Sequence, residues 1–276
     1  MSNEVLVSTG ALIGRPNGRD FRLLKELTPK INSDGFEFMM YSTWYGREDE
    51  IVDFLKSNDI HTPCFHCQKS IGESISKGSK EDWKDAFDKF EINVKMASEI
   101  SAKKMVMHLW DGMTSDAFME NNLKAYPMLK DIADGYGVDL LIENVVCNVN
   151  DPMSHWMELL DLYPDIGFIF DTKMAAFHGQ LELLYDKKYE MLWKEKHIRH
   201  YHVNDYGGGL KDWANLRTLP IGKGHIDFDR FFSFIEKIGY KGTYTLESTA
   251  FNKEGFVDTD MLNEEIAYVK NKLGMH

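Results

Sequence analysis

Short apolar segments alternate with longer amphipathic segments along the whole chain. The short segments are rich in β-branched and aromatic residues and predict strands; residues 138–144, Val-Asp-Leu-Leu-Ile-Glu-Asn, are typical. The longer segments predict helices, as in residues 81–100, where Trp83, Phe87 and Phe90 recur at helical spacing. Eight strands are predicted, at residues 5–12, 36–41, 61–67, 104–110, 138–144, 166–171, 198–205 and 243–247.

A helix is predicted after each of the eight strands. The predicted helices are residues 20–32, 48–58, 81–100, 117–136, 152–162, 181–196, 227–238 and 259–273. Strands that alternate with helices form a parallel sheet with the helices packed outside it. Eight such units in ~250 residues have the length of a (β/α)₈ TIM barrel, which is one domain.

We therefore predict an α/β fold, a single (β/α)₈ TIM barrel domain over residues 1–276. No segment rich in Pro, Gly or Ser divides the chain. The alternative is an open, doubly wound sheet, which requires a glycine-rich turn after the first strand. Gly10 and Gly14, without a third glycine, match that turn only weakly.

Composition and charge restrict the class of partner. The chain has 44 acidic and 32 basic residues and a net charge of −12, which argues against binding to nucleic acid or to an anionic membrane. It contains no run of ~18 apolar residues that would span a membrane, and its first residues do not resemble a signal peptide. We expect a cytoplasmic protein that binds a small molecule, and we leave a homo-oligomer open.

Polar residues follow the apolar runs at the points where four predicted strands end. Glu143 and Asp171 end the fifth and sixth strands, His202 lies in the seventh, and Glu247 ends the eighth. Because the carboxyl ends of barrel strands share one face, these side chains are expected to lie together. A carboxylate in such surroundings is costly to desolvate unless it is paired or coordinated.

Three carboxylates and one imidazole favour a divalent metal ion. Three neighbouring anions repel one another, so at least one would be protonated unless a cation removed the penalty. Oxygen ligands with one nitrogen suit Mn²⁺, which we favour, as well as Mg²⁺ or Co²⁺, and also Zn²⁺ with water completing its shell. The alternative is a salt bridge, but Arg199 is the one cation at these strand ends, and its side chain points away from the face of His202.

Five segments, in register with the predicted strands, carry a family resemblance. They are Leu-Ile-Glu-Asn at 141–144, Phe-Asp-Thr at 170–172, Tyr-His-Val-Asn-Asp at 201–205, Leu-Pro-Ile-Gly-Lys-Gly-His-Ile-Asp-Phe at 219–228 and Tyr-Lys-Gly-Thr-Tyr-Thr-Leu-Glu at 240–247. With them the chain resembles the sugar isomerase/epimerase superfamily of xylose isomerase-like barrels. That superfamily includes ketose 3-epimerases, inosose dehydratases and apurinic-site endonucleases.

The resemblance implies that Glu143, Asp171, His202 and Glu247 hold one metal ion, and that Glu143 and Glu247 act as the acid/base pair. Substrate-binding roles are expected for a further set of residues, His66, His108, Arg217, Trp110 and His178.

The reasons for these substrate-binding roles differ. His66, His108 and Arg217 stand where relatives have pocket-facing residues. The indole of Trp110 either lines the pocket or covers the barrel end. Relatives carry a histidine three residues after the sixth-strand aspartate, where this chain has Met174; His178, one helical turn further on, either substitutes for it or is a surface residue.

The chain departs from the family's residues at two places, and these departures narrow the expected function. Leu216 and Thr218 stand where the endonuclease branch has an aspartate and a histidine, and Met39-Met40-Tyr41 replaces a glutamate common at the end of the second strand. We therefore expect a metal-dependent isomerase or epimerase that moves a proton next to the carbonyl of a small ketose, keto-polyol or sugar phosphate. An inosose-type dehydratase and a non-catalytic sugar- or metal-binding barrel are the alternatives.

Overall fold

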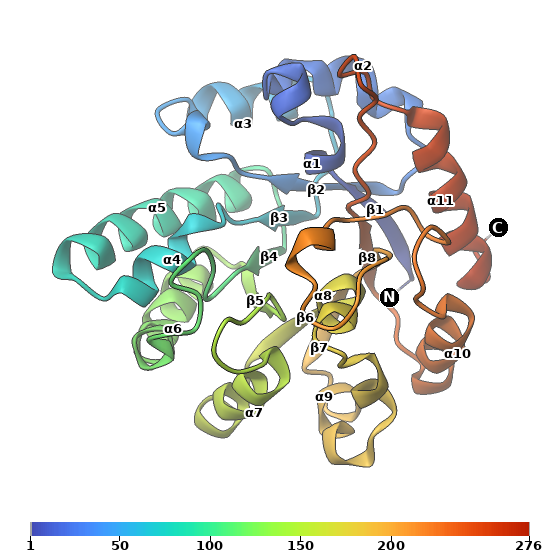
Figure 1. Cartoon of the computed structure of the whole chain (residues 1–276). Helices are drawn as coiled ribbons and strands as arrows, with labels where there is room; N and C mark the ends of the chain where they lie inside the picture. Colours follow the sequence, from blue (N-terminus) through green and yellow to red (C-terminus); the bar gives the residue numbers. More distant parts are fainter. Residues whose placement is uncertain (1, 276) are drawn as a thin grey trace. The chain divides into compact units, whose positions relative to one another are not determined.

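The computed structural model of the protein describes residues 2–275. Eight parallel strands follow one another in chain order and close into a barrel (Figure 1), which confirms the predicted (β/α)₈ fold and excludes the open sheet. The strands are β1 (Glu4–Ser8), β2 (Gly35–Met39), β3 (Cys64–His66), β4 (Lys104–Met107), β5 (Asp139–Glu143), β6 (Gly167–Asp171), β7 (Ile198–His202) and β8 (Thr243–Leu246).

Helices and short helical turns connect the strands. The α-helices are α1 (Thr9–Leu12), α2 (Leu24–Leu27), α3 (Glu48–Ser57), α4 (Ser70–Lys77), α5 (Lys80–Glu99), α6 (Met119–Gly135), α7 (Pro152–Leu162), α8 (Thr172–Phe177), α9 (Met191–Lys194), α10 (Phe228–Ile238) and α11 (Thr259–Lys272). The 3₁₀ turns are Arg15–Asn17, Phe21–Leu23, Thr28–Lys30, Ser42–Trp44, Leu181–Tyr185, Lys187–Tyr189 and Trp213–Asn215. Among the described residues, no helix is long and apolar enough to cross a membrane.

Two predicted helices are wrong. Residues 20–32 form the single-turn α2 between two 3₁₀ turns, because Pro29 lacks the N–H that would continue the α-helical hydrogen bonds. Residues 181–196 form two 3₁₀ turns and α9. There the side chain of Asp186 accepts a hydrogen bond from the backbone of Lys188, which competes with a continuous helix.

The chain packs as two compact units, each described here by itself. The first comprises residues 2–37, 58–61 and 170–275, and it contains β1, β7 and β8. In this unit Tyr244 of β8 lies opposite both Val5 and Tyr201. The rings of Tyr201 and Tyr244 stack with their centroids 5.7 Å apart, and α11 packs against β1.

The second unit comprises residues 38–57 and 62–169 and contains β3, β4 and β5. Its helices α4, α5 and α6 pack against one another, as Figure 1 shows in teal and green. Helix α4 also approaches the end of β4, where Asn122 of α6 donates a 2.6 Å hydrogen bond to the carbonyl of Leu109. A Cβ atom on Gly72 of α4 would lie 2.1 Å from the backbone oxygen of His108, so only glycine fits there.

We predict that Gly72→Ala destabilises the fold by about 1–3 kcal/mol, the usual cost of overpacking, because the backbone at His108 must move to admit the methyl group. Urea denaturation measures this change. Gly135→Ala in α6 is the matched control, since a Cβ atom there meets nothing within 4 Å and alanine is the better helix former. Equal stability of the two variants would contradict the tight contact.

Candidate functional site

In the first unit, three of the four predicted metal ligands lie together. Asp171 ends β6, His202 ends β7, and Glu247 directly follows β8. Nδ1 of His202 is 3.9 Å from Oδ2 of Asp171 and 3.5 Å from Oε2 of Glu247. Asp171 and His202 are completely buried. One nitrogen and two carboxylate oxygens therefore converge in a site that is largely shielded from solvent.

Asn204 holds the two carboxylates of this group together. Its side-chain Nδ2 donates to Oδ2 of Asp171 and to Oε2 of Glu247, both at 3.2 Å, and its Oδ1 accepts the backbone N–H of Glu247 at 2.8 Å. The backbone of Asn204 is fixed in turn by the hydroxyl of Thr172. We assigned no role to Asn204 from the sequence, although it lies in the Tyr-His-Val-Asn-Asp segment.

Each carboxylate oxygen of Asp171 has a separate task. Oδ1 accepts the backbone N–H of Met174 at 2.9 Å and so caps the N-terminus of α8, while Oδ2 faces His202. The start of α8 directly after β6 therefore fixes the orientation of the carboxylate that the site uses.

A third carboxylate of the same unit, Glu37 of β2, contacts His202. It is completely buried, and its Oε2 is 3.0 Å from Nε2 of His200 and 3.2 Å from Nε2 of His202. Burial alone would raise the pKa of Glu37, but the two histidines outweigh burial and lower it well below its ordinary value. We looked for a polar residue at the end of the second strand and missed Glu37, although an acidic residue within the apolar run Gly-Phe-Glu-Phe-Met was a usable signal.

The remaining predicted residues of the first unit are Arg217 and His178. Arg217 is exposed, and the segment that follows it is wrapped around the carboxylate of Asp205. That carboxylate accepts the backbone N–H groups of Gly222 and Gly224 at 2.9 and 2.8 Å. His178 is buried directly after α8. The substrate-binding roles of Arg217 and His178 stay predictions.

In the second unit, Glu143, His66 and His108 form a separate buried group. Nε2 of His108 is 2.9 Å and Nε2 of His66 is 3.6 Å from Oε2 of Glu143. The other ring nitrogen of His66 lies 2.8 Å from the carbonyl of Cys67, and that of His108 lies 2.9 Å from Oδ2 of Asp111. Both Nδ1 atoms are thus placed to donate, and both Nε2 atoms lie on the side of Glu143.

Two effects of opposite sign act on the pKa of His108 in this group. Burial by itself lowers the pKa of His108, but the negative charges of Glu143 and Asp111 raise it above the usual histidine value. The nearby Trp110 is completely buried and donates its indole N–H to the carbonyl of Val146 at 3.2 Å. Trp110 thereby supports the loop after β5, and its contact with substrate stays a prediction.

Both groups offer ligands of the kind that divalent metals prefer. In each group, one donor atom from every member lies within 4.8 Å of the others: Asp171, His202 and Glu247 in the first unit, and His66, His108 and Glu143 in the second. In the first group two carboxylates converge, and a divalent cation would remove the repulsion between them. The second group offers one carboxylate and two imidazole nitrogens, which are also common ligands of divalent cations. The place of Glu143 in the predicted four-ligand set stays a prediction.

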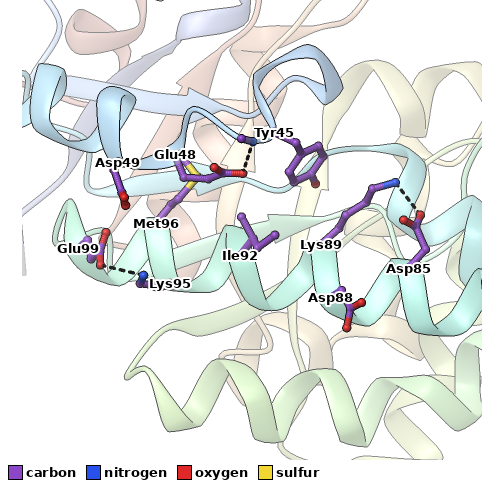
Figure 2. A pocket seen from close by; sticks show the side chains of 11 residues that line it. Tyr45, Glu48, Asp49, Asp85, Asp88, Lys89, Ile92, Lys95, Met96 and Glu99 are labelled. Atoms are coloured by element: carbon purple, nitrogen blue, oxygen red, sulfur yellow. Dashed lines mark hydrogen bonds and ion pairs between the residues drawn. The ribbon is translucent and has the colours of Figure 1, made fainter.

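Two hollows elsewhere involve none of the predicted site residues. One of about 550 Å³ lies between the start of α3 and the face of α5 in the second unit (Figure 2). Figure 2 shows Lys89 directed toward Asp85, with which it forms a 2.6 Å ion pair beside Tyr45. The other hollow, of about 430 Å³, lies in the first unit between residues 220–229 and α11.

A scan against family models matches residues 26–272 to the xylose isomerase-like TIM barrel family. The chain belongs to this family. The match to an uncharacterized protein of Methanocaldococcus jannaschii is 24% identical and covers 88% of this chain and 83% of that protein. The match to the L-ribulose-5-phosphate 3-epimerase UlaE of Escherichia coli is 26% identical and covers 44% of this chain and 33% of the epimerase.

Solved structures with the same fold include two of particular interest. D-allulose 3-epimerase from Methylomonas sp., in complex with D-allulose, has a TM-score of 0.70 at 14% identity, covering 98% of this chain and 97% of that one. The IolI protein with a bound zinc atom has a TM-score of 0.69 at 16% identity, covering 98% and 96%. At these identities the likeness shows the fold.

Glu265 of α11 is a buried carboxyl group that borders the second hollow. Its Oε1 accepts the backbone N–H of Ile221 at 2.7 Å and the hydroxyl of Ser248, the residue after Glu247, at 2.8 Å. Burial raises the pKa of Glu265 to about 7, and the charge of Asp205 adds to the effect. The folded protein therefore holds a proton on Glu265 at pH values where the unfolded chain has lost it.

We predict that this proton makes stability fall as the pH rises from about 4.5 to 7, because the native state binds more protons than the unfolded state in that window. The contribution of Glu265 is at most about 3 kcal/mol. The test compares wild type with Glu265→Gln by urea denaturation from pH 4.5 to 8. The difference in unfolding free energy between them should change with pH, whereas Glu264→Gln, at an exposed neighbour, should give a constant difference.

Proposed function

We propose that the protein is a divalent-metal-dependent isomerase or epimerase that moves a proton next to the carbonyl of a small ketose, keto-polyol or sugar phosphate. The observation that carries the proposal is the convergence of Asp171, His202 and Glu247 on one point, with Asn204 bridging both carboxylates. Membership of the xylose isomerase-like family and the match to 3-epimerases support the same reaction class.

Asp171, His202 and Glu247 would hold the metal ion, and the sequence adds Glu143 as the fourth ligand. We favour Mn²⁺, as the sequence prediction did; the zinc in the IolI structure makes Zn²⁺ the first ion to compare with it. When bound, a divalent ion polarises the substrate carbonyl and makes the neighbouring carbon-bound hydrogen more acidic.

The carboxylates of the chain would move the proton. We assign this role to Glu247 and Glu143, one for each face of the substrate carbon, so that one removes the proton and the other returns it. Asn204 fixes Glu247 through both its backbone N–H and its carboxylate, which keeps the group in a constant orientation. His108, whose pKa is raised, lies 2.9 Å from Glu143 and would keep that carboxylate in place.

Burial of the proposed site residues would keep water away from the reaction. Asp171, His202 and Glu143 are almost completely buried, so an electrostatic interaction with the substrate is stronger there than it would be in water. Glu247 is the most exposed of the four, with a side chain 10% accessible, which suits the group that must meet a substrate entering from solvent.

We predict that the protein binds Mn²⁺ or Zn²⁺ and is stabilised by it, by about 2.7 kcal/mol at 100 times the dissociation constant. Asp171→Asn keeps the oxygen that caps α8 but removes the charge, so metal affinity should fall at least about tenfold while the apo fold persists. Calorimetric titration and thermal denaturation with and without chelator measure both effects. Glu264→Gln serves as the control with unchanged affinity, and a wild type that takes up no metal would refute the proposal.

We predict that Glu247→Gln lowers turnover at least about a hundredfold, the usual contribution of a general base. In D₂O the substrate should also gain deuterium at the carbon beside the carbonyl. D-allulose, D-tagatose and L-ribulose 5-phosphate are suitable first substrates, followed by NMR with the metal-loaded protein. Conversion without deuterium uptake, together with an undiminished Glu247→Gln variant, would eliminate the proton-transfer mechanism.

A further inference from the structure

Glu37 lies at the centre of a buried hydrogen-bond cluster behind His202. It belongs to β2, whereas its partners His200 and His202 are 163 and 165 residues away in β7, and Thr245 is in β8. The strand register brings them together: β1 pairs with β2, where Ser8 lies opposite Glu37, and also with β8, and β8 pairs in turn with β7, where Thr245 lies opposite His202. Alternate residues of these strands point to the same face, so the three partners reach one carboxylate.

One oxygen of Glu37 receives every hydrogen bond that the carboxylate makes within the described residues. Oε2 is 3.0 Å from His200 Nε2, 3.2 Å from His202 Nε2 and 2.9 Å from the hydroxyl of Thr245. Oε1 is buried and has no hydrogen-bond partner among the residues that the structure describes. The Thr245 hydroxyl donates to this oxygen, and the lowered pKa of Glu37 keeps the carboxylate ionised, so it has no proton of its own to offer to the imidazole nitrogens.

This arrangement decides which nitrogen of His202 carries the proton. An ionised carboxylate only accepts, so the hydrogen of the neutral His202 ring must be on Nε2. Nδ1 then presents its lone pair, and Nδ1 is the atom that lies 3.5 Å from Glu247 and 3.9 Å from Asp171. The opposite tautomer would place two lone pairs face to face at Glu37 and a hydrogen in the ligand position.

We propose that Glu37 is a positioning residue for the metal site: it holds His202 as the Nε2–H tautomer, orients the ring, and makes Nδ1 a stronger ligand. The inference rests on the metal site of the proposed function and adds a residue to it. A carboxylate that accepts from the second nitrogen of a metal-binding imidazole fixes the tautomer and raises ligand basicity, and its loss typically costs 10–100-fold in metal affinity.

The other residues of the cluster offer a control substitution that distinguishes a positioning role of Glu37 from a packing role. His200 is held at both ring nitrogens, since its Nδ1 lies 2.5 Å from the hydroxyl of Thr243 while Nε2 lies beside Glu37. Thr245 donates to the same Glu37 oxygen but has no part in the proposed ligand set. Thr245→Val therefore removes the hydroxyl that contacts Glu37 Oε2 at 2.9 Å and His200 Nε2 at 3.0 Å, and it leaves the contact between Glu37 and His202 in place.

The first measurement needs no substitution in the cluster. Protein labelled with ¹⁵N-histidine, free of metal, is examined by long-range ¹H–¹⁵N NMR near neutral pH, with His202→Gln identifying the His202 signals. The expected result is a hydrogen on Nε2 of His202. A His202 ring without a hydrogen on Nε2 overturns the inference, whether or not the protein binds metal.

The second measurement compares Mn²⁺ affinity, from the EPR signal of free Mn²⁺, among wild type, Glu37→Gln and Thr245→Val. Glu37→Gln should weaken binding 10–100-fold, whereas Thr245→Val should change it less than about threefold. Equal weakening by both variants would mean that Glu37 acts through packing alone and would overturn the inference. If the wild type binds no metal, the proposed function and the metal role of Glu37 fall together, and the tautomer measurement still decides whether Glu37 sets the His202 ring.

Discussion

The free-energy cost of burying carboxylates is the constraint on which the rest of this site depends. Glu37, Asp171 and Glu143 are essentially without solvent exposure, and an isolated charge in such a position is prohibitive. The charge of each carboxylate is stabilised by polar groups on other strands or loops. These groups are two histidines and a threonine for Glu37, the amide of Asn204 for Asp171, and two histidines for Glu143. The polar residues of the strands are therefore coupled to one another, and the barrel framework has to hold them in register.

Much of the fold could be predicted from sequence because its signals are local. The apolar runs gave eight strands in the right places, and the helix predicted at residues 152–162 has the observed bounds. The short helices α4 and α8 were not predicted. The six residues of α8 are all buried and show no amphipathic period, whereas α4 does bury Ile71 and Ile75 one turn apart but is only eight residues long and contains three serines and a glycine. Pro29 was present in a predicted helix and should have ended it.

Only part of the candidate site could be predicted from the sequence. Asp171, His202 and Glu247 end apolar strands, so their position alone indicated that they would meet. Asn204 and Glu37 were missed because their importance lies in contacts with distant residues: Asn204 with Glu247, 43 positions away, and Glu37 with His202, 165 positions away. A polar residue inside a strand can also be a core residue, and only its partners distinguish the two.

In each of three residues of the first-unit site, one polar atom contacts the surrounding scaffold and another faces the site. Asp171 uses one oxygen to cap α8 and the other to face the site, and Asn204 uses its oxygen for the backbone of Glu247 and its nitrogen for two carboxylates. His202 has Nε2 beside Glu37 and Nδ1 beside Glu247. One atom of each side chain is thus held by the scaffold, which removes its rotational freedom before any ligand arrives. Because that ordering is achieved on folding, binding at the second atom loses little conformational entropy, and this favours both affinity and a fixed geometry for proton transfer.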